Sequence, residues 1–590
     1  MEKISAPIVK KIEYGKKSIE EMDQQFADFG QNDLILNYPT VYIVEDKSSH
    51  NAYSVYVGET TDIKRRSLEH LKNDVGAGTD NDTASQKFWE KIDKSKTSEM
   101  YIIGHDHFNK SLTLDIENKL IHYMSSIDSV KLDNGRTNPQ NSYYTEDELN
   151  AIFSKIWKKL RNDNKELFPL ERVIQDSAIF KASPFHKLTV EQLRAKDEIL
   201  MKIEEALNRD KSGQLILING SAGTGKTVLL SSLFFELAKS SQTDDNKILE
   251  GSNNYLLVNH DQQLKVYQQI AEKLDLKGDG TVVSKPTKFI NDHTEDEKAD
   301  VVLIDEAHLL WTQGKQSYRG KNQLQDILNR AKVVVAVFDE RQILSREQYM
   351  DSEDMHKLVL GTQIEGNYIK LHNQMRINAN SDTVNWIRNL IDNQVVTNIP
   401  RDDKYELKVF DNPENMYEAI KEKSKDVENG ISRMLATFDW PYVDAKKPDD
   451  SQYWNVTIGD FSMPWNLQLP RIRDRKINYK NLSWAEQQQT IDEVGSTFTI
   501  QGFDLNYAAV IIGPSVKYRN GKVVFDRTAS QNKKAIQKRT YKGEKIDASE
   551  DLLKNELNVL ITRGVNGLYV YAVDEQLQDA LLKAQKGDIN

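Results

Sequence analysis

Residues 215–230 read LILINGSAGTGKTVLL, and this stretch constrains the fold more than any other part of the chain. An apolar run leads into a glycine-rich turn, and a second apolar segment follows. Gly220, Gly225, Lys226 and Thr227 have the G-x-x-x-x-G-K-[ST] spacing of a phosphate-binding loop. Several backbone N–H groups must point at one phosphate chain, which crowds the backbone and favours glycine. The pattern predicts a strand, a tight turn and a helix.

The same stretch predicts how a nucleotide is held. A helix that opens at Gly225 offers the positive end of its dipole to phosphate. Lys226 can reach the β- and γ-phosphates of ATP, and the Thr227 hydroxyl can hold Mg²⁺. The predicted contacts of the loop are Gly220, Ser221, Ala222, Gly223, Thr224, Gly225, Lys226 and Thr227.

A second buried strand ends in two carboxylates. Residues 301–308 read VVLIDEAH, which places Asp305 and Glu306 at the carboxyl edge of the expected parallel sheet, beside the loop. Asp305 is predicted to hold the Mg²⁺ shell. Glu306 is predicted to orient or deprotonate the attacking water.

Composition sets outer bounds on the function. At 590 residues the chain is long enough for three or four domains, and it contains no cysteine, so a disulfide and a thiolate metal site are excluded. We find neither an apolar run of membrane-spanning length nor an apolar signal core at the N-terminus. These features predict a cytoplasmic protein without a membrane partner. The net charge of −11 argues against nucleic acid as a partner. The argument is weak, because binding needs only a local basic groove.

Further polar residues follow the expected strands in a fixed order. The ordered set resembles the motor core of superfamily 1 helicases, in which two RecA-like domains hold ATP between them. By that resemblance Gln192 is the adenine-reading glutamine, Asp339 and Gln342 form motif III, and Arg376 and Arg563 are the arginine fingers. Motif V is QGFD at 501–504.

The resemblance is closer to a bacterial branch related to the helicase-like region of Schlafen proteins. It covers about residues 188–575, and QGFDLNYAAVIIGP and NVLITRG are its strongest points. The sequence departs from the superfamily at motif V, where Asp504 stands in place of the usual glutamate.

Residues 40–70 contain two short β-rich runs and then a basic helix. They resemble the GIY-YIG nuclease family, with the YIG element at Tyr56-Val57-Gly58 and the first element reduced to Thr40-Val41-Tyr42. Arg66 and His70 have the family spacing, and four residues apart they share one helix face. The match covers about residues 38–145.

The helix at 113–124, TLDIENKLIHYM, matches the metal helix of that family, with Glu117 as the carboxylate. Its late asparagine is Asn134, with Asn138 as the alternative. Phosphodiester cleavage needs a hard cation on a carboxylate, an arginine for developing charge, and a phenol or histidine to activate water. The predicted catalytic set is Tyr42, Tyr56, Arg66, His70, Glu117 and Asn134.

Two other clusters of charged or polar residues each allow two interpretations. His105, Asp106 and His107 could form a second metal site or end a strand at the substrate edge. Residues 515–546 carry ten basic residues against Asp526 and Glu544, as a nucleic-acid groove or a solvated loop would.

Together these features predict a multidomain α/β chain: a small GIY-YIG domain followed by two RecA-like P-loop domains with parallel sheets. The expected divisions are a helical extension at 1–37, the nuclease at 38–145, a helical connector at 146–187, and RecA-like domains at 188–355 and 356–590.

The predicted function is an ATP-dependent nucleic-acid motor fused to an endonuclease that uses Mg²⁺ or Mn²⁺. DNA is favoured over RNA. A bacterial DNA-degrading or phage-defence role is expected by analogy, with a homo-oligomer or a defence-system protein as a further partner. The alternatives are an ATP-switched clamp that licenses cleavage without unwinding, and a regulatory binding protein with an inert nuclease domain.

Overall fold

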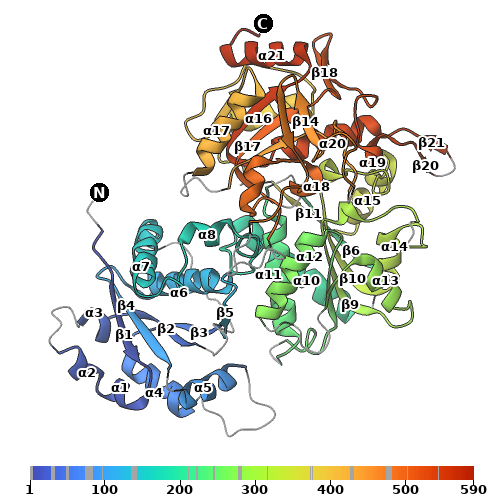
Figure 1. Cartoon of the computed structure of the whole chain (residues 1–590). Coiled ribbons are helices and arrows are strands. Elements are labelled where there is room, and N and C mark those ends of the chain that lie inside the picture. The colour runs from blue at the N-terminus through green and yellow to red at the C-terminus, as the bar shows by residue number, and fades with distance from the viewer. Residues whose placement is uncertain are drawn as a thin grey trace. The chain divides into compact units, whose positions relative to one another are not determined.

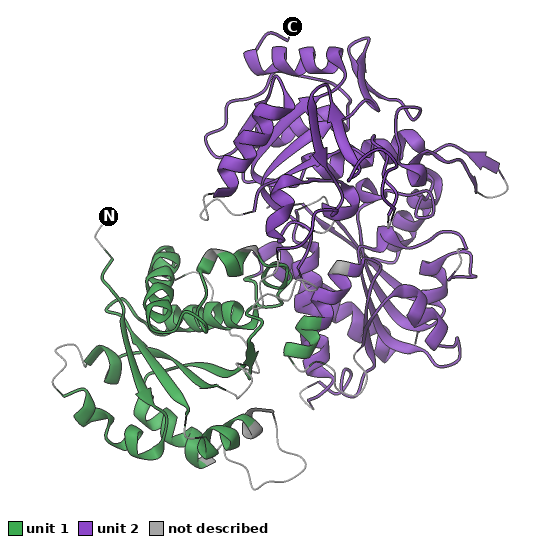
Figure 2. Ribbon diagram, in the orientation of Figure 1, with its two compact units in different colours: residues 1–187, 269–276 green, residues 188–268, 277–590 purple. Residues whose placement is uncertain are grey.

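The structure is a computed structural model of the chain (Figure 1). It describes residues 4–27, 33–47, 52–73, 84–95, 97–133, 143–209, 211–220, 223–243, 246–274, 276, 282–314, 317–372, 374, 376–425, 431–444, 446–472, 482–500, 503–541 and 544–589. The chain divides into two compact units (Figure 2). Unit 1 contains residues 1–187 and 269–276, and unit 2 contains residues 188–268 and 277–590.

Unit 1 is built on a five-stranded sheet of order β1-β4-β2-β3-β5. Pairing is antiparallel except between β3 and β5, which run parallel. The strands are β1 (Ile8–Glu13), β2 (Thr40–Lys47), β3 (Tyr53–Thr60), β4 (Glu99–Gly104) and β5 (Val130–Leu132). Val41, Ile43, Val55 and Val57 are fully buried, because β-branched side chains pack well on a pleated sheet.

Residues 8–13 correct the prediction of a helical extension over 1–37. They form the edge strand β1, which pairs with β4 from Ile8↔Gly104 to Glu13↔Glu99. Ile8 and Ile12 lie on the same side of the strand and are buried, while Lys11 on the other side is exposed, so the segment adds one strand to the edge of the sheet. The sequence signal was weak because the strand is short and half polar.

The helices of unit 1 include the segment that the sequence predicted to be a connector. Helix α7 contacts β1 and α6, and Trp157 packs among Tyr123, Phe153 and Phe168. Residues 146–187 therefore belong to the body of unit 1. Its helices are α1 (Lys16–Glu20), α2 (Met22–Gln25), α3 (Asp33–Leu36), α4 (Ile63–Asn73), α5 (Ala84–Lys94), α6 (Lys110–Ser125), η1 (Glu146–Glu148), α7 (Leu149–Asp163), α8 (Glu171–Asp176) and α9 (Ala178–Lys181).

The first sheet of unit 2 is six-stranded and parallel, in the order β11-β6-β10-β9-β7-β8. Leu215 and Leu217 of β6 belong to the core cluster that includes residues of α13 (Pro286–Asp292) and α14 (Gln323–Leu328). The alternate residues Ile216 and Ile218 point to the opposite face. Its strands are β6 (Gln214–Gly220), β7 (Asn254–Val258), β8 (Val282–Ser284), β9 (Ala299–Asp305), β10 (Ala331–Phe338) and β11 (Tyr368–Leu371).

Helices cover both faces of this sheet, as the near-continuous apolar strands require. Helices α10 and α11 pack on each other and on the sheet, while α13, α14 and α15 also contact its strands. The helices are α10 (Val190–Asn208), α11 (Lys226–Ser240), α12 (Asp261–Lys273), α13 (Pro286–Asp292), η2 (Ala307–Leu309), α14 (Gln323–Leu328), η3 (Glu340–Gln342) and α15 (Ser352–Ile364).

The second sheet of unit 2 is five-stranded and parallel, in the order β12-β22-β17-β13-β16. Its strands are β12 (Glu406–Val409), β13 (Arg433–Ala436), β16 (Val494–Gly495), β17 (Leu505–Ile512) and β22 (Gly564–Ala572). Its helices are α16 (Ser381–Ile391), α17 (Pro413–Lys425), η5 (Gln488–Asp492), α18 (Thr497–Ile500), α19 (Lys533–Ile536), α20 (Ser549–Ile561) and α21 (Glu575–Lys586). The two parallel sheets confirm the predicted α/β class and are consistent with RecA-like domains.

Three antiparallel hairpins are inserted around the second sheet. The aromatic region at 411–490 packs Phe438, Trp440 and Trp465 against the first of them. The hairpins pair β14 (Asn455–Ile458) with β15 (Phe461–Pro464), β18 (Val516–Arg519) with β19 (Lys522–Phe525), and β20 (Arg539–Tyr541) with β21 (Glu544–Ile546). Among the described residues, the helices are too short or too polar to cross a membrane.

A glycine in unit 1 gives a test of this packing. Gly58 pairs with Tyr42 across β2 and β3, and a Cβ on Gly58 would lie 2.4 Å from the Tyr42 ring. We expect Gly58→Ala to destabilise the chain by about 1–3 kcal/mol, as overpacking does. Gly15→Ala is the control, because Gly15 has extended backbone and nothing within 4 Å of the added carbon. Urea unfolding measures both, and equal midpoints would contradict the packing described.

Candidate nucleotide and metal sites

Strand register brings the predicted nucleotide-binding residues together in unit 2. Strand β6 lies between β11 and β10, with Leu371 opposite Gly220 and Phe338 opposite Asn219. Strand β9 pairs with β10 on its other side. The carboxyl ends of parallel strands meet at one edge of a sheet, so the residues that follow β6, β9, β10 and β11 converge there.

The glycines of the phosphate-binding loop stand at positions where another residue would be strained or would clash. Gly223 and Gly225 have φ of 85° and 74°, in the left-handed region that favours glycine. A Cβ on Gly223 would lie 2.3 Å from Cβ of Arg376, and one on Gly220 would lie 2.5 Å from Oγ1 of Thr224. Thr224 is buried. Ser221 and Ala222 lie outside the described residues.

Lys226 begins helix α11, directly after the loop. Its Nζ donates to the Gly220 carbonyl at 2.6 Å and lies 3.4 Å from Oδ2 of Asp339. Burial would raise the pKa of Asp339, but Lys226 and the Gln342 amide help to hold it below its ordinary value. The loop lysine and the predicted motif III aspartate therefore form a buried ion pair. Thr227 follows Lys226 in the first turn of the helix.

Asp305 is buried at the end of β9. It accepts hydrogen bonds from the Tyr267 hydroxyl at 2.8 Å and the Gln263 amide at 2.6 Å. Burial, together with the neighbouring Glu306 charge, raises the pKa of Asp305 to about 7. A bound cation would stabilise the ionised form of a carboxylate whose pKa is raised in this way.

Glu306 has φ of 51°, a left-handed conformation that costs a residue other than glycine of the order of 1 kcal/mol. Its Oε2 lies 3.1 Å from Nε2 of the buried His308, and that carboxylate oxygen has no hydrogen-bond partner among the described residues. Strained backbone with an unsatisfied buried acceptor is typical of a functional position.

Two arginines reach this site, Arg376 after β11 of the first sheet and Arg563 directly before β22 of the second. Arg376 lies against the loop at Gly223, and its Nη1 is buried without a hydrogen-bond partner among the described residues. Arg563 is 1% exposed and donates to Oε1 of Gln342 at 3.3 Å. Burial lowers the pKa of Arg563 to about 10, and the nearby Arg376 charge adds to this. Gln501 and Gly502 lie outside the described residues.

The side chain of Gln192 is buried and hydrogen-bonded within the protein, unlike an exposed amide that reads a base. Its Oε1 accepts from the Thr189 backbone N–H at 2.9 Å in a capping box, and its Nε2 donates to the Thr224 carbonyl at 3.1 Å. The side chain therefore braces the phosphate-binding loop, and one amide hydrogen remains for a further contact. A cavity of about 510 Å³ lies beside helix α10, which carries Gln192, and it is lined in part by Glu191, Arg194 and Lys370.

Sequence reasoning missed several members of this site. Gln263 and Tyr267 of α12 hold Asp305, but their helix has only ordinary amphipathic spacing. Asp504 was noted only as part of motif V and as a departure from the superfamily there. Its Oδ1 lies 2.7 Å from Nε of Arg376 and 3.8 Å from Nη1 of Arg563.

The predicted nuclease residues of unit 1 also lie close together. The Tyr42 hydroxyl is 2.9 Å from Nε2 of His70, and Arg66 is hydrogen-bonded to both Tyr42 and Tyr56. His70 is buried and stacks on Trp89 at 3.9 Å between ring centroids. Burial raises the pKa of Tyr42 well above its ordinary value, so Tyr42 remains a phenol. Tyr56 is more accessible than either His70 or Tyr42.

Glu117 of α6 lies beside a carboxylate that the sequence analysis did not single out. Burial and the nearby Glu59 charge raise the pKa of Glu117 to about 8. Glu59 pairs with Lys110 through one oxygen, while its Oε2 is buried without a hydrogen-bond partner among the described residues. Two such carboxylates fit a divalent cation. Asn134 and its alternative Asn138 lie outside the described residues.

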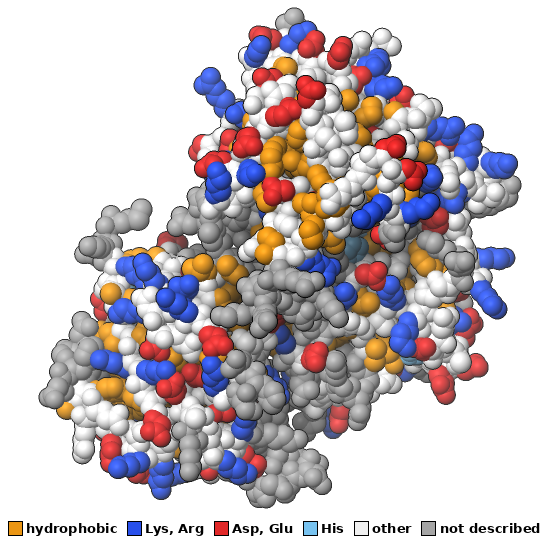
Figure 3. Space-filling model, viewed as in Figure 1, with side chains coloured by type: hydrophobic (Ala, Val, Ile, Leu, Met, Phe, Trp, Pro, Cys, Tyr) orange, Lys and Arg blue, Asp and Glu red, His pale blue; other side chains and the backbone are white. Residues whose placement is uncertain are grey.

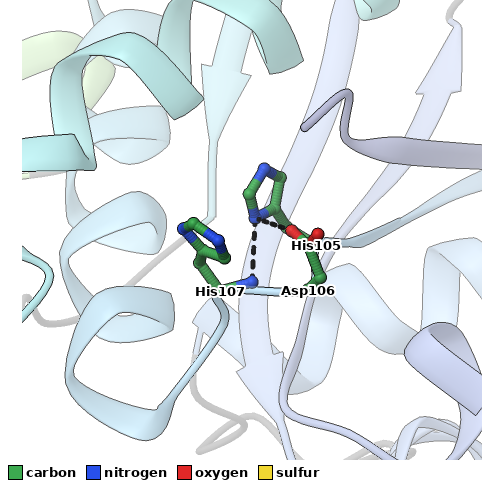
Figure 4. A group of neighbouring side chains, drawn as sticks. All are labelled: His105, Asp106 and His107. Atoms are coloured by element: carbon green, nitrogen blue, oxygen red, sulfur yellow. Dashed lines mark hydrogen bonds and ion pairs between the residues drawn. The ribbon is translucent and has the colours of Figure 1, made fainter. Parts of the chain in front are cut away.

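The histidine cluster at the end of β4 is not arranged as a free ligand set (Figure 4). Ligand atoms of His105, Asp106 and His107 lie within 4.8 Å of one another. However, Nδ1 of His105 accepts the His107 backbone N–H at 3.0 Å, and its Nε2 lies 3.1 Å from the Ser5 hydroxyl. Both ring nitrogens are engaged, so the strand-end interpretation is favoured over a metal site.

Much of the basic segment 515–546 is paired within unit 2. Lys517 bonds Asp526, Arg519 bonds Asp574, Arg527 bonds Asp547, and Arg539 donates to Thr312 and to the carbonyls of Arg346 and Tyr349. Basic side chains still gather on the surface over the edge where β20 and β21 lie (Figures 1 and 3). Fewer basic side chains of this segment are therefore available to a nucleic acid than the sequence implied.

A phosphate-binding loop at the edge of one parallel sheet, faced by one arginine from that sheet and one from a second, is the arrangement of a nucleotide-dependent, RecA-like motor. Residues 213–574 match the Schlafen group 3 DNA/RNA helicase domain over more than half of the chain, and the chain belongs to this family. This confirms the predicted helicase-like motor, and membership implies the use of a nucleotide with Mg²⁺ and the binding of nucleic acid. The match does not extend into residues 1–212.

A protein of the yeast Saccharomyces cerevisiae is also similar to this chain. It is 36% identical over 439 residues, which cover 68% of this chain and 91% of the yeast protein. The yeast protein is described as uncharacterized, so it adds no activity. A relative of this extent therefore occurs in a eukaryote.

Glu117 gives a pH test of the unit 1 site. Its pKa is about 8 in the folded chain against an ordinary 4.5, so the folded state binds more protons between these values. Its contribution to the free energy of unfolding is therefore greatest below pH 4.5 and is lost as pH rises to about 8. We expect Glu117→Gln to become progressively more stable than wild type over this range, as measured by urea unfolding without added metal. A difference independent of pH would contradict this.

Proposed function

We propose that this chain is an ATP-driven motor on nucleic acid joined to a metal-dependent endonuclease. The observation that carries the motor is the approach of Arg376 to Gly223 of the loop, together with the Arg563–Gln342 hydrogen bond. Arg376 follows β11 of the first sheet, and Arg563 directly precedes β22 of the second, so the Arg563–Gln342 hydrogen bond links the second parallel sheet to the nucleotide site of the first. A planar guanidinium delivered in this way suits the charge of a transferring phosphoryl group, and it makes turnover depend on how the two halves fit together.

The residues of the nucleotide site fit ATP with Mg²⁺. Gly220, Gly223 and Gly225 add no side chain to the loop backbone, and Lys226 would meet the β- and γ-phosphates. Thr227 and Asp305 would hold Mg²⁺, which neutralises phosphate charge when bound. Glu306 would orient the attacking water, with Arg376 and Arg563 stabilising charge. Gln192 would retain the loop geometry, with Asp339 and Gln342 linking Lys226 to Arg563.

The endonuclease proposal depends on the cluster in unit 1. Arg66 would stabilise charge on the scissile phosphate, and Tyr56 is the more accessible phenol for activating water. The buried His70 would position Tyr42 through its hydrogen bond. Glu117, with Glu59 beside it, would hold Mg²⁺ or Mn²⁺, a cation that polarises phosphate and water when bound. Asn134 remains part of the proposed set on the family resemblance alone.

The biological setting is proposed by analogy. A nuclease and a motor in one chain are both useful if they act on the same polymer, as in restriction or phage defence. We favour DNA as that polymer. Strand displacement by the full chain would support a motor, whereas nucleic-acid-stimulated ATP turnover without displacement would support the clamp.

Two substitutions test the ATP site. Lys226→Ala removes the charge that meets the phosphates, and Glu306→Gln keeps the shape of the side chain but removes a base. We expect ATP turnover to fall at least about 10²-fold in both, with ATP still bound by Glu306→Gln. Lys239→Ala, at the other end of α11, is the matched control. Turnover above a tenth of wild type in either variant would oppose the assignment.

Three substitutions test the nuclease in the full chain with labelled DNA and RNA and Mg²⁺ or Mn²⁺. Arg66→Ala, Tyr56→Phe and Glu117→Gln should each slow cleavage by about 10²-fold, the scale for losing a key charge or acid–base group. ATP turnover should stay within about threefold of wild type, because the substitutions lie in the other unit. Arg65→Ala is the control, since Arg65 is exposed and pairs with Glu69. Normal cleavage by all three variants would place the active site elsewhere, and an uncut substrate with wild-type chain would favour an inert domain.

A further inference from the structure

Helix α20 carries the Arg563 guanidinium at its C-terminal end. The helix spans Ser549–Ile561, and Arg563 follows two residues later, directly before β22. Nε of Arg563 donates to the Val559 carbonyl at 3.0 Å, so the side chain folds back on the last turn of α20. The position of α20 therefore decides where this guanidinium lies.

Although α20 belongs to the second half of unit 2, its N-terminal part is anchored in the first half. Leu552 and Leu553 are buried in the core cluster that contains Leu215 of β6 and Ile343. The same helix contacts β17 of the second sheet and the short helix η3 at Glu340–Gln342. One helix thus contacts elements of both halves.

Two asparagines, Asn555 and Asn558, dock α20 on η3. They stand three residues apart, so they share one face of the helix. Their side-chain amides donate to three backbone carbonyls of the η3 segment, Asn555 to Glu340 at 3.1 Å and Ile343 at 3.0 Å, and Asn558 to Arg341 at 3.0 Å. This segment also carries Gln342, whose Oε1 accepts from Arg563. The two amides and the guanidinium therefore bind the same turn.

The Asn558 side chain has partners in both halves of unit 2. It is 2% exposed, and besides its bond to the Arg341 carbonyl its Oδ1 accepts from Nη2 of Arg388 in α16 at 2.7 Å. A carboxamide supplies both the donor and the acceptor that these partners need. Aspartate would keep the acceptor for Arg388, but it would lose the donor and place an oxygen against a carbonyl.

We propose that Asn555 and Asn558 are positioning residues for ATP turnover. They dock α20 on η3 and so hold the Arg563 guanidinium where charge develops on the transferring phosphoryl group. They act through Arg563 rather than on the nucleotide. A misplacement of about 1 Å in a catalytic group can cost about 10²-fold in rate. This inference rests on the proposed motor function and adds two residues that set its geometry.

Asn558→Asp in the full chain tests this, because it keeps the shape of the side chain and loses the donor to Arg341. We expect kcat for ATP at saturating single-stranded DNA to fall about tenfold or more. The Kd of a fluorescent ATP analogue should stay within about threefold of wild type, because Arg563 acts on charge that develops during transfer. Asn555→Ala should behave in the same way. Asn415→Asp is the matched control, since Asn415 is an exposed asparagine of another helix, α17.

An Arg563→Ala background separates positioning from a purely structural role. If Asn558 acts through Arg563, Asn558→Asp should change the residual ATP turnover of that background by less than about twofold. Losses of about tenfold in both backgrounds would overturn the inference. Values of kcat within about twofold of wild type in both Asn558→Asp and Asn555→Ala would also overturn it.

Absence of ATP turnover in the wild-type chain would oppose the proposed motor and not this inference. Binding of ADP with aluminium fluoride, which mimics the transferring phosphoryl group, then tests the two asparagines. Asn558→Asp should weaken binding of this pair about tenfold and leave the binding of ADP alone unchanged. Equal binding of the pair by variant and wild type would overturn the inference.

Discussion

The parallel pairing of β6 with β10 on one side and β11 on the other is the constraint on which unit 2 depends. It places Gly220 opposite Leu371 and Asn219 opposite Phe338. The loop after β6, the carboxylate after β10 and the arginine after β11 must then leave the sheet at the same edge. No local feature of those three segments would bring them together without this register.

Burial makes the charges at this edge dependent on one another. Lys226 helps to keep Asp339 ionised, Asp504 faces two arginines, and Asp305 has a pKa near neutrality because it is buried beside Glu306. Removing one partner from such a set leaves an uncompensated charge in a low-dielectric site. A nucleotide with its cation brings both signs of charge, which is why this environment suits it.

Unit 1 achieves a compact cluster by different means. The antiparallel pairing of β2 with β3 places the Tyr42 ring over Gly58, where a Cβ would lie 2.4 Å away, and this explains glycine at the end of the Tyr-Val-Gly element. His70 is held between the Tyr42 hydroxyl and the Trp89 ring. The aromatic side of the cluster is therefore closely packed, whereas Tyr56, Arg66 and Glu117 are partly exposed.

The sequence by itself determined the parallel α/β class of unit 2 and its phosphate-binding loop, because strand periodicity and loop glycines are local properties. Together with the helicase resemblance, it also predicted that Lys226, Asp305, Arg376 and Arg563 belong to one site. The family match supports the motor region, while the nuclease assignment and the individual roles remain predictions.

Only the tertiary structure decided how charges are shared. It assigned Asp504 to two arginines, engaged Gln192 with the loop, paired much of the basic segment, and made Ile8–Glu13 a strand. Each of these depends on groups far apart along the chain, and a local pattern does not encode which distant partner a polar side chain meets once burial has removed water as a competitor.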